Sequence, residues 1–317
     1  MPLKREVKQT ISEIKSLRIQ GARNVAKAAM QALGGAAHTS KAKTPEALLR
    51  ELTLTADALA ASRPTEPMMR NALEEALRRF FTDVGGRKPR TLEEARRAVL
   101  DEVASFEKKA AHSHGLIAQF GAKEIPQGAT VLTHCHSSTV TAILKRAHKE
   151  GRRINVICTE TRPLYQGHIT ARELSSAGIP TTLIVDSAIK SIMRDVDLVL
   201  VGADAITSSG ELVNKIGTAT LAFVAYEEEL NFYSAAELFK FDPLTLWGKV
   251  EPIEQRDVRE VADPRRLPGV RILNPAFDLT PAKHITAYIT EHGVVAPQSV
   301  YALASKHFEL VDKNGKR

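Results

Sequence analysis

The sequence of 317 residues has few of the features that mark several large classes of protein. Its only cysteines, Cys135 and Cys158, are too few for a disulfide framework, which favours a reducing compartment. No apolar run is long enough to span a bilayer. No apolar segment follows the first residues, as a secretory signal would require. We therefore expect a cytoplasmic protein that does not associate with membranes.

Aromatic residues make up only 5% of the chain, which leaves few rings on which nucleic acid bases could stack. The formal net charge is +7, but the basic residues are dispersed and cluster only in Gly85–Arg90 and Lys313–Arg317. A phosphorylated small substrate accounts for this charge better than a nucleic acid does. We therefore expect no nucleic acid partner.

Two common phosphate-binding motifs, the P-loop and the Gly-x-Gly-x-x-Gly fingerprint, are absent. Metal ligands are also poorly placed. His134, Cys135 and His136 are adjacent, so on a strand they point to alternate faces, and no second ligand cluster is evident. We expect neither a metal nor a cofactor.

The first part of the chain has apolar residues at helical spacing, punctuated by helix caps and breakers. The threonine of Thr44-Pro45-Glu46 and the capping box Thr91-Leu92-Glu93-Glu94 are strong helix starts. These signals predict helices over residues 5–17, 24–33, 44–60 and 91–114, and one from Pro67 to before Gly85. Gly21–Arg23 marks the start of the second helix, and Gly34-Gly35 is its expected stop.

After Gly121 the pattern changes to short β-branched runs that alternate with helical ones. This alternation predicts an α/β fold with a doubly wound, mostly parallel sheet. A helical domain of residues 1–120 would precede a sheet domain of residues 121–317. The expected strands are Ala129–Thr133, Ile154–Thr159, Thr181–Val185 and Asp197–Val201, with later ones at Phe232–Ala235, Arg271–Leu273 and Ile285–Thr290; the expected helices are 139–150, 171–177 and 187–194.

Two of the expected strands end in side chains that can exchange protons. Cys135 follows Ala129–Thr133, and Asp204 follows Asp197–Val201. Ligands of such sheets bind just past the carboxyl ends of the strands. A helix start after Cys135, with His134 and His136 adding positive charge, would favour a thiolate. Alternatively, Cys135 is a buried core residue and Asp204 caps the next turn.

Several other residues are suited to holding an anion. Arg162 ends a strand, Gln166 follows in a loop, and Lys215 lies where a helix is expected to open. Gly21–Arg23 marks a helix start, and Arg63 lies in a rigid turn with Pro64. Each of these has a plain structural interpretation as well, such as a surface ion pair or an exposed lysine.

Taken together, these motifs resemble one superfamily. The ordered strings are Thr133–Ser137, Thr159–Pro163, Gly167–Ala171, Gly202–Asp204, Asn214–Thr218 and Asn274–Asp278. The superfamily contains the regulatory subunits of initiation factor two-B, methylthioribose-1-phosphate isomerases and ribose-1,5-bisphosphate isomerases. Arg63–Thr65 and Ala236–Phe241 make the chain most similar to the archaeal-type ribose-1,5-bisphosphate isomerases. Gln20, where arginine is common, and Glu66–Met69, more acidic and bulky than usual, depart from that pattern.

The resemblance implies a helical N-terminal domain, a Rossmann-like C-terminal domain, and dimers assembled into a hexamer. It implies an aldose–ketose isomerase of nucleotide (AMP) salvage that takes a phosphorylated sugar, with Cys135 and Asp204 catalytic. The substrate-binding residues that it implies are Gly21, Ala22, Arg23, Arg63, Ser137, Arg162, Gln166, Asn214, Lys215 and Lys240. An initiation-factor-like regulatory subunit and a methylthioribose-1-phosphate isomerase remain the alternatives.

Overall fold

A computed structural model describes residues 3–78, 80, 89–250 and 253–307. The chain forms two compact units, Met1–His112 and Ser113–Arg317. The boundary expected at residue 120 falls inside helix α5 (Leu92–Lys123), and it stays a prediction. Most of the basic cluster Gly85–Arg90, all of Lys313–Arg317, and the expected helix end before Gly85 lie outside the described residues.

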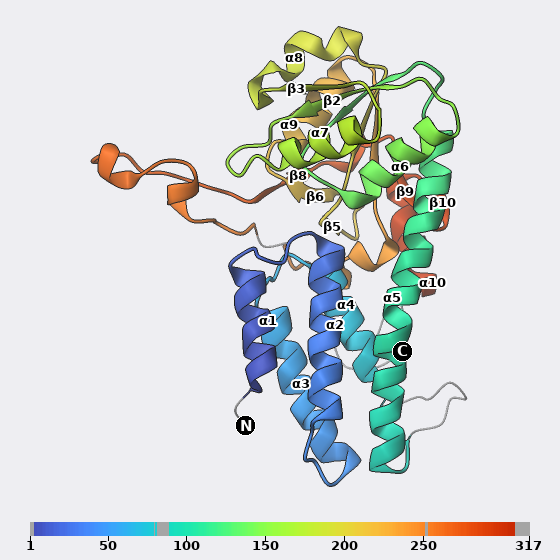
Figure 1. Cartoon of the computed structure of the whole chain (residues 1–317), viewed down its shortest axis with the longest axis vertical. Coiled ribbons are helices and arrows are strands. Elements are labelled where there is room, and N and C mark those ends of the chain that lie inside the picture. The colour runs from blue at the N-terminus through green and yellow to red at the C-terminus, as the bar shows by residue number, and fades with distance from the viewer. Residues whose placement is uncertain (1–2, 79, 81–88, 251–252, 308–317) are drawn as a thin grey trace. The chain divides into compact units, whose positions relative to one another are not determined.

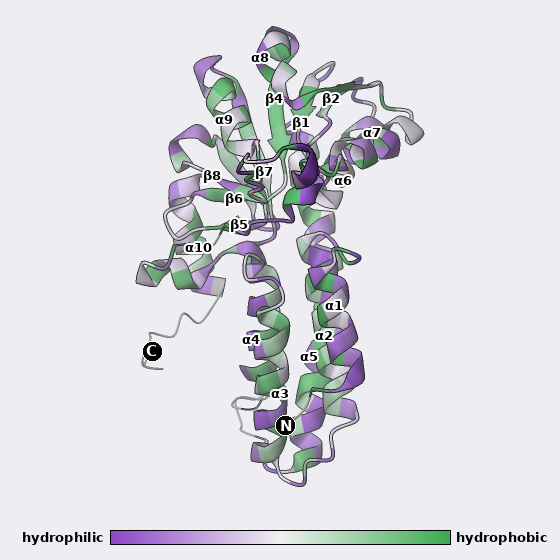
Figure 2. Cartoon of the chain, turned by 90° about the vertical axis from the view of Figure 1, so that its left-hand side faces the viewer, coloured by the Kyte–Doolittle hydropathy of each residue, from purple (hydrophilic) through white to green (hydrophobic). Residues whose placement is uncertain are grey.

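The N-terminal unit is helical, as predicted. Its helices are α1 (Arg5–Lys15), α2 (Ala22–His38), α3 (Pro45–Ala60), α4 (Pro67–Arg78) and the first part of α5. Two of the predicted caps form: Thr44 Oγ1 accepts the Ala47 N–H at 3.2 Å, and Thr91 Oγ1 accepts the Glu94 N–H at 3.2 Å. Hydrophobic residues on the inner faces of these helices, shown together with the polar outer faces in Figure 2, build the core of this unit.

The stop expected at Gly34-Gly35 is wrong, because α2 continues through both glycines to His38. A Cβ atom at Gly34 would lie 3.1 Å from the Val103 side chain, so the glycine lets α2 approach α5 closely. The helix expected over 91–114 likewise runs on to Lys123.

The C-terminal unit is built on a seven-stranded sheet with the order β10-β9-β7-β4-β1-β2-β3. All neighbours in it are parallel except β10, which pairs antiparallel with β9. The strands are β1 (Thr130–Thr133), β2 (Asn155–Thr159), β3 (Thr181–Ile184), β4 (Leu198–Val201), β7 (Asn231–Ala235), β9 (Ala287–Thr290) and β10 (Gly293–Val295). A small antiparallel sheet follows β4 in the chain and consists of β5 (Ala205–Ile206), β6 (Leu212–Lys215) and β8 (Phe277–Thr280).

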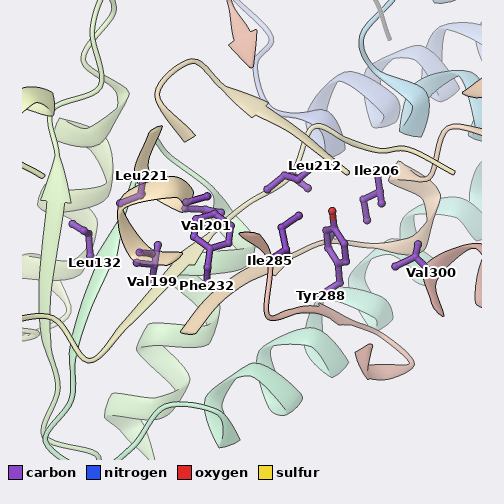
Figure 3. Packing of buried hydrophobic residues seen from close by; sticks show 14 of the residues in the cluster. Leu132, Val199, Val201, Ile206, Leu212, Leu221, Phe232, Ile285, Tyr288 and Val300 are labelled. Atoms are coloured by element: carbon purple, nitrogen blue, oxygen red, sulfur yellow. The ribbon is translucent and has the colours of Figure 1, made fainter. Parts of the chain in front are cut away.

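Helices cover both faces of the large sheet. Apolar residues of α6 (Ser138–Lys149), α7 (Gln166–Ser176) and the end of α5 pack on one face. Residues of α8 (Ile189–Ile192), α9 (Thr218–Glu227) and α10 (Val300–His307) pack on the other, in the core shown in Figure 3. β4 is buried along its whole length, as expected for a central strand covered on both sides.

The predicted fold class is confirmed, with local corrections. Arg271–Leu273 is not a strand: it lies in an irregular segment before β8 whose base is closed by the bridge between Gln255 and Pro275 (Figure 1). The helix expected over 187–194 is broken into α8 and short 3₁₀ turns, and α7 begins at Gln166 instead of residue 171. Within the described ranges, no helix has the length and hydropathy that a membrane span requires.

Candidate functional site

Cys135 and Asp204 follow the neighbouring central strands β1 and β4, which pair in parallel. The chain leaves the large sheet differently after these two strands: β1 leads into α6, and β4 leads into the small sheet. A Cβ atom at Gly202 would lie only 2.8 Å from Ser137 Oγ, so glycine is required for the two strand ends to come this close. Burial raises the pKa of the Cys135 thiol, and the charge of Asp204 adds to this effect. The two predicted catalytic residues therefore lie at one edge of the sheet.

The backbone of Cys135 adopts a left-handed conformation, with φ of 67°. This conformation costs a residue with a side chain about 1–2 kcal/mol. Hydrogen bonds fix it on both sides: Thr161 Oγ1 accepts the Cys135 N–H at 2.8 Å, and Thr170 Oγ1 donates to the Cys135 carbonyl at 2.8 Å. Two threonines from the loop after β2 and from α7 thus hold the peptide units that flank the sulfur.

His134 is buried and its protonation is set by its partners. Its Nε2 lies 2.8 Å from the Ile216 carbonyl, which can only accept, so Nε2 carries a proton. Its Nδ1 lies 2.6 Å from Thr159 Oγ1. Burial lowers the pKa of His134, so the ring is neutral near pH 7 and Nδ1 accepts the Thr159 hydroxyl proton.

His136 is also held neutral. Because Thr170 Oγ1 gives its proton to the Cys135 carbonyl, it accepts from His136 Nδ1 at 3.0 Å. Burial lowers the pKa of His136, and this effect outweighs the nearby carboxylate of Glu173. The expectation that His134 and His136 add positive charge beside the sulfur is therefore wrong.

Cys135 itself is a thiol near neutral pH. Burial raises its pKa to about 11, although the positive charge of Lys215 and a hydrogen bond from the His136 N–H act in the opposite direction. The expected resting thiolate is therefore wrong. The reason is that α6 begins only at Ser138, capped by Ser137, so its N-terminus does not outweigh desolvation of the sulfur.

The segment around Asp204 is held by its backbone neighbours. The Asp204 N–H donates to the Val213 carbonyl of β6 at 3.0 Å. The buried Lys240 donates from Nζ to the Ala203 carbonyl at 2.7 Å and lies 3.4 Å from Glu237 Oε2. Lys240 therefore contacts the peptide unit that precedes Asp204, and its role in binding substrate stays a prediction.

Asn214 and Lys215 belong to strand β6, so the expectation that they open a helix is wrong. Gly217 ends this segment with φ of 101°, and α9 begins at Thr218. Asn214 Nδ2 donates to Thr218 Oγ1 at 3.0 Å. The charge of Lys215 lowers the pKa of Cys135, against the larger effect of burial.

Asp278 on β8 holds the first turn of α9. Its carboxylate accepts the Gly217 N–H at 2.7 Å and the Ala219 N–H at 3.1 Å. Burial nevertheless raises the pKa of Asp278 to about 6, against the lowering effect of these bonds and of Lys215.

Arg162 and Gln166 flank a turn that leads from β2 into α7. Arg162 is exposed, donates to Tyr165 Oη at 2.6 Å and stacks on the Tyr165 ring with 5.1 Å between the guanidinium carbon and the ring centre. Gln166 is the first residue of α7 and has a buried Oε1 that accepts no hydrogen bond. Asp186, after β3, binds this turn by accepting the backbone N–H groups of Thr161 and Arg162 at 2.8 and 2.7 Å.

The remaining predicted residues lie in the N-terminal unit. Gly21 caps α2 with φ of 81°, and Ala22 and Arg23 form its first turn. Arg63 Nε lies 3.2 Å from Oε1 of the buried Glu66. Each unit is described by itself, so the participation of Gly21, Ala22, Arg23 and Arg63 in the site stays a prediction.

Sequence reasoning missed Thr161, Thr170 and Asp186. Thr161 and Thr170 lie in two of the strings that carry the family resemblance, but neither was given a role, and Asp186 follows an edge strand without any motif. Among the described residues, no group of three histidine, cysteine, aspartate or glutamate side chains is arranged to hold a metal ion.

Comparison with known proteins places the chain in a family. Residues 18–297 match the Initiation factor 2 subunit family. The chain is 40% identical over 308 residues to the ribose 1,5-bisphosphate isomerase of Methanocaldococcus jannaschii, covering 97% of each protein. It is 39% identical to the methylthioribose-1-phosphate isomerase of Pelotomaculum thermopropionicum, covering 90% of this chain and 81% of that protein.

A solved structure of a Pyrococcus horikoshii protein described as translation initiation factor eIF-2B superposes with a TM-score of 0.80 at 31% identity, covering 93% of this chain and 98% of that one. The sequence and structural matches extend over nearly the same length. The chain therefore belongs to the Initiation factor 2 subunit family.

Proposed function

We propose that this chain is an aldose–ketose isomerase that converts ribose 1,5-bisphosphate to ribulose 1,5-bisphosphate. The observation that carries the proposal is the 40% identity to a ribose 1,5-bisphosphate isomerase along almost the whole of both chains. Cys135 and Asp204, at the ends of adjacent strands, supply a base and an acid for the reaction.

Asp204 opens the sugar ring in this proposal. The anomeric oxygen of the substrate carries a phosphate, so the ring cannot open by loss of an anomeric hydroxyl proton. Asp204 as a carboxylic acid instead protonates the ring oxygen, and the bond between that oxygen and C1 breaks. The carboxylate that remains then accepts the proton of the C2 hydroxyl as the ketone forms.

Cys135 carries the proton between the two carbons. As a thiolate it removes the C2 proton, which leaves a C1–C2 double bond, and as a thiol it returns that proton to C1. Each of the two residues ends the cycle in its starting form. Positioned acid–base groups of this kind each accelerate a reaction by about 10²- to 10⁴-fold.

The mechanism requires Cys135 and Asp204 to hold one proton in total. Asp204 must carry it, so that the sulfur is a thiolate. Burial holds Cys135 as a thiol, with a pKa of about 11, and the charge of Asp204 contributes to this. Moving the proton from sulfur to Asp204 forms the base and the acid in one step and leaves the pair with the same single negative charge. Lys215 stabilises the resulting thiolate.

Two phosphates at opposite ends of the sugar need cationic and amide partners. In the C-terminal unit, Lys215 and Arg162 offer positive charge, and Ser137, Gln166 and Asn214 offer hydrogen bonds. Lys240 donates a hydrogen bond to the carbonyl of Ala203, the residue before Asp204. The proposal adds Gly21, Ala22, Arg23 and Arg63 from the N-terminal unit as partners of a phosphate.

We further propose that the enzyme is cytoplasmic, takes part in AMP salvage, and assembles as dimers that form a hexamer. These proposals rest on the family resemblance and, for the compartment, on the low cysteine content. Size-exclusion chromatography with light scattering tests the assembly, since a monomer would exclude it.

The decisive experiment incubates the purified chain with ribose 1,5-bisphosphate and follows ribulose 1,5-bisphosphate. Methylthioribose 1-phosphate, which ends in an apolar thioether, runs in parallel because an isomerase of that compound is 39% identical to this chain. We expect turnover of the bisphosphate to exceed that of the thioether. Preference for the thioether would reassign the substrate, and turnover of neither would favour a regulatory subunit.

A further inference from the structure

Asp186 binds two backbone N–H groups at the carboxyl edge of the sheet. Its Oδ1 accepts the Thr161 N–H at 2.8 Å and its Oδ2 accepts the Arg162 N–H at 2.7 Å. Both are hydrogen bonds to an ionised acceptor, which are about twice as strong as neutral ones. Thr161 itself has a left-handed backbone, with φ of 61°, and therefore depends on such bonds to hold its conformation.

Each of the two bonds leads to a different part of the candidate site. Thr161 Oγ1 accepts the N–H of Cys135, so the position of the Thr161 backbone sets the position of the sulfur-bearing residue. Arg162 is the arginine proposed to bind phosphate. One carboxylate from the end of β3 thus fixes the residue that would move the proton and the residue that would hold the substrate.

Asp186 also contributes charge. Its carboxylate raises the pKa of Cys135, as does that of Asp204, whereas Lys215 and the His136 N–H lower it. Removal of the Asp186 charge therefore makes the sulfur easier to ionise, while removal of its hydrogen bonds loosens the sulfur's position. Loss of the charge should speed the reaction of the thiol with an electrophile, whereas loss of the hydrogen bonds should slow turnover.

We propose that Asp186 is a positioning residue that acts on Cys135 through Thr161 and on Arg162 directly, and so aligns proton transfer with substrate binding. This inference rests on the proposed function for its effect on turnover, but its effect on Cys135 is independent of any substrate.

The chain offers a matched control at the opposite edge of the sheet. Asp197 accepts the Thr130 N–H at 2.8 Å through Oδ2, so it too ties a strand end with a carboxylate. It lies at the amino end of β4, away from the strand ends that carry Cys135 and Asp204. Asp197→Asn therefore reports the cost of losing such a bond where no chemistry is proposed.

The experiment uses the full chain with Cys158→Ala, which leaves Cys135 as the only thiol. Asp186→Asn and Asp197→Asn are compared by turnover of ribose 1,5-bisphosphate and by the rate of iodoacetamide alkylation at pH 8. For Asp186→Asn we expect kcat to fall about 10- to 100-fold. We expect alkylation to become faster than in Asp197→Asn, as loss of a nearby like charge predicts. Asp197→Asn should change neither.

Thr161→Val is the second variant, in case Asp186→Asn does not fold. It removes the acceptor for the Cys135 N–H but no charge, so kcat should fall while alkylation at pH 8 changes less than twofold. Unchanged kcat in Thr161→Val, or equal losses in Asp186→Asn and Asp197→Asn, would overturn the inference. If the parent protein does not turn over the bisphosphate, the proposed function fails, and the alkylation rates still decide whether Asp186 acts on Cys135.

Discussion

The two edges of the large sheet differ in which residues adopt a positive φ. At the amino edge, three turns that need a positive φ use glycine, at Gly128, Gly151 and Gly178, although Glu229 departs from this pattern. At the carboxyl edge, Cys135, Thr161 and Tyr165 adopt positive φ with side chains present, although the turn after β9 uses Gly293. Left-handed conformations at residues other than glycine are costly. Thr161 and Thr170 hold Cys135 by hydrogen bonds to its N–H and carbonyl, and Asp186 holds Thr161 by accepting its N–H.

The glycines of the two edges differ as well. A Cβ atom at Gly128 or Gly151 would meet nothing within 4 Å, so these glycines serve backbone conformation alone. At the carboxyl edge, a Cβ at Gly167 would lie 1.7 Å from the Thr159 carbonyl oxygen and one at Gly202 would lie 2.8 Å from Ser137. The glycines at the amino edge therefore permit tight turns, whereas those at the carboxyl edge permit close approach of neighbouring segments.

The largest effect should come from the two proposed catalytic residues. Cys135→Ser and Asp204→Asn should each lower kcat by about 10²- to 10⁴-fold, because each removes one positioned acid–base group. Each substitution keeps the size of the side chain nearly constant, so the melting temperature should change little. Cys158→Ala, at the buried cysteine inside β2, is the control and should retain kcat. Wild-type turnover in either catalytic variant would remove the assigned roles.

A pH effect on stability should arise from Asp278. Its pKa in the folded chain is about 6, above the ordinary aspartate value of 3.8, so the folded state binds this proton more tightly than the unfolded state does. The contribution of Asp278 to stability therefore falls as pH rises from about 4 to 6 and is constant above that. The free energy of unfolding, measured by urea titration, should fall by up to ~3 kcal/mol relative to Asp278→Asn across this interval. A difference between the two proteins that is independent of pH would contradict this.

A pair of alanine substitutions tests the glycine comparison. Gly128→Ala should cost about 1–2 kcal/mol in unfolding free energy, because φ is positive there, and should leave kcat intact. Gly202→Ala must displace Ser137 or β4, so we expect a loss of kcat together with a similar loss of stability. Kinetics and thermal melts of both proteins check this, and equal kcat values would show that the close approach at Gly202 is not needed for turnover.

The smallest effect should come from the partner of Arg162. Tyr165→Phe removes the hydroxyl that accepts from Arg162 at 2.6 Å but keeps the ring on which the guanidinium stacks. A hydrogen bond of this kind is worth about 0.5–1.5 kcal/mol, so KM should rise by roughly two- to tenfold with kcat unchanged. A fall in kcat without a change in KM would place Arg162 in the chemical step instead of in binding.

Local signals in the sequence predicted the sheet domain well. The runs at Ala129–Thr133 and Asp197–Val201 contain β1 and β4, because buried parallel strands are short, apolar and bounded by breakers. Strand β6 was missed because Asn214 and Lys215 are polar and lie in a short antiparallel sheet, where pairing with β8 overrides propensity.

The ionisation state of Cys135 was harder to predict from the sequence than its place at a strand end. The motif around Cys135 identified the sulfur, but its pKa depends on how deeply the folded chain buries it and on charges at Asp186, Asp204 and Lys215, which come from three other segments. Thr161, Thr170 and Asp186 act through backbone hydrogen bonds, which leave no periodicity or spacing in the sequence.

The burial that keeps Cys135 protonated has a consequence for the lifetime of the enzyme. Electrophiles such as peroxides react far faster with a thiolate than with a thiol. Enzyme that is not turning over substrate therefore contains little of the form that reacts with them. In the proposed mechanism the sulfur becomes reactive chiefly when a proton moves to Asp204 during turnover. Occupied enzyme should therefore be the state that oxidants inactivate.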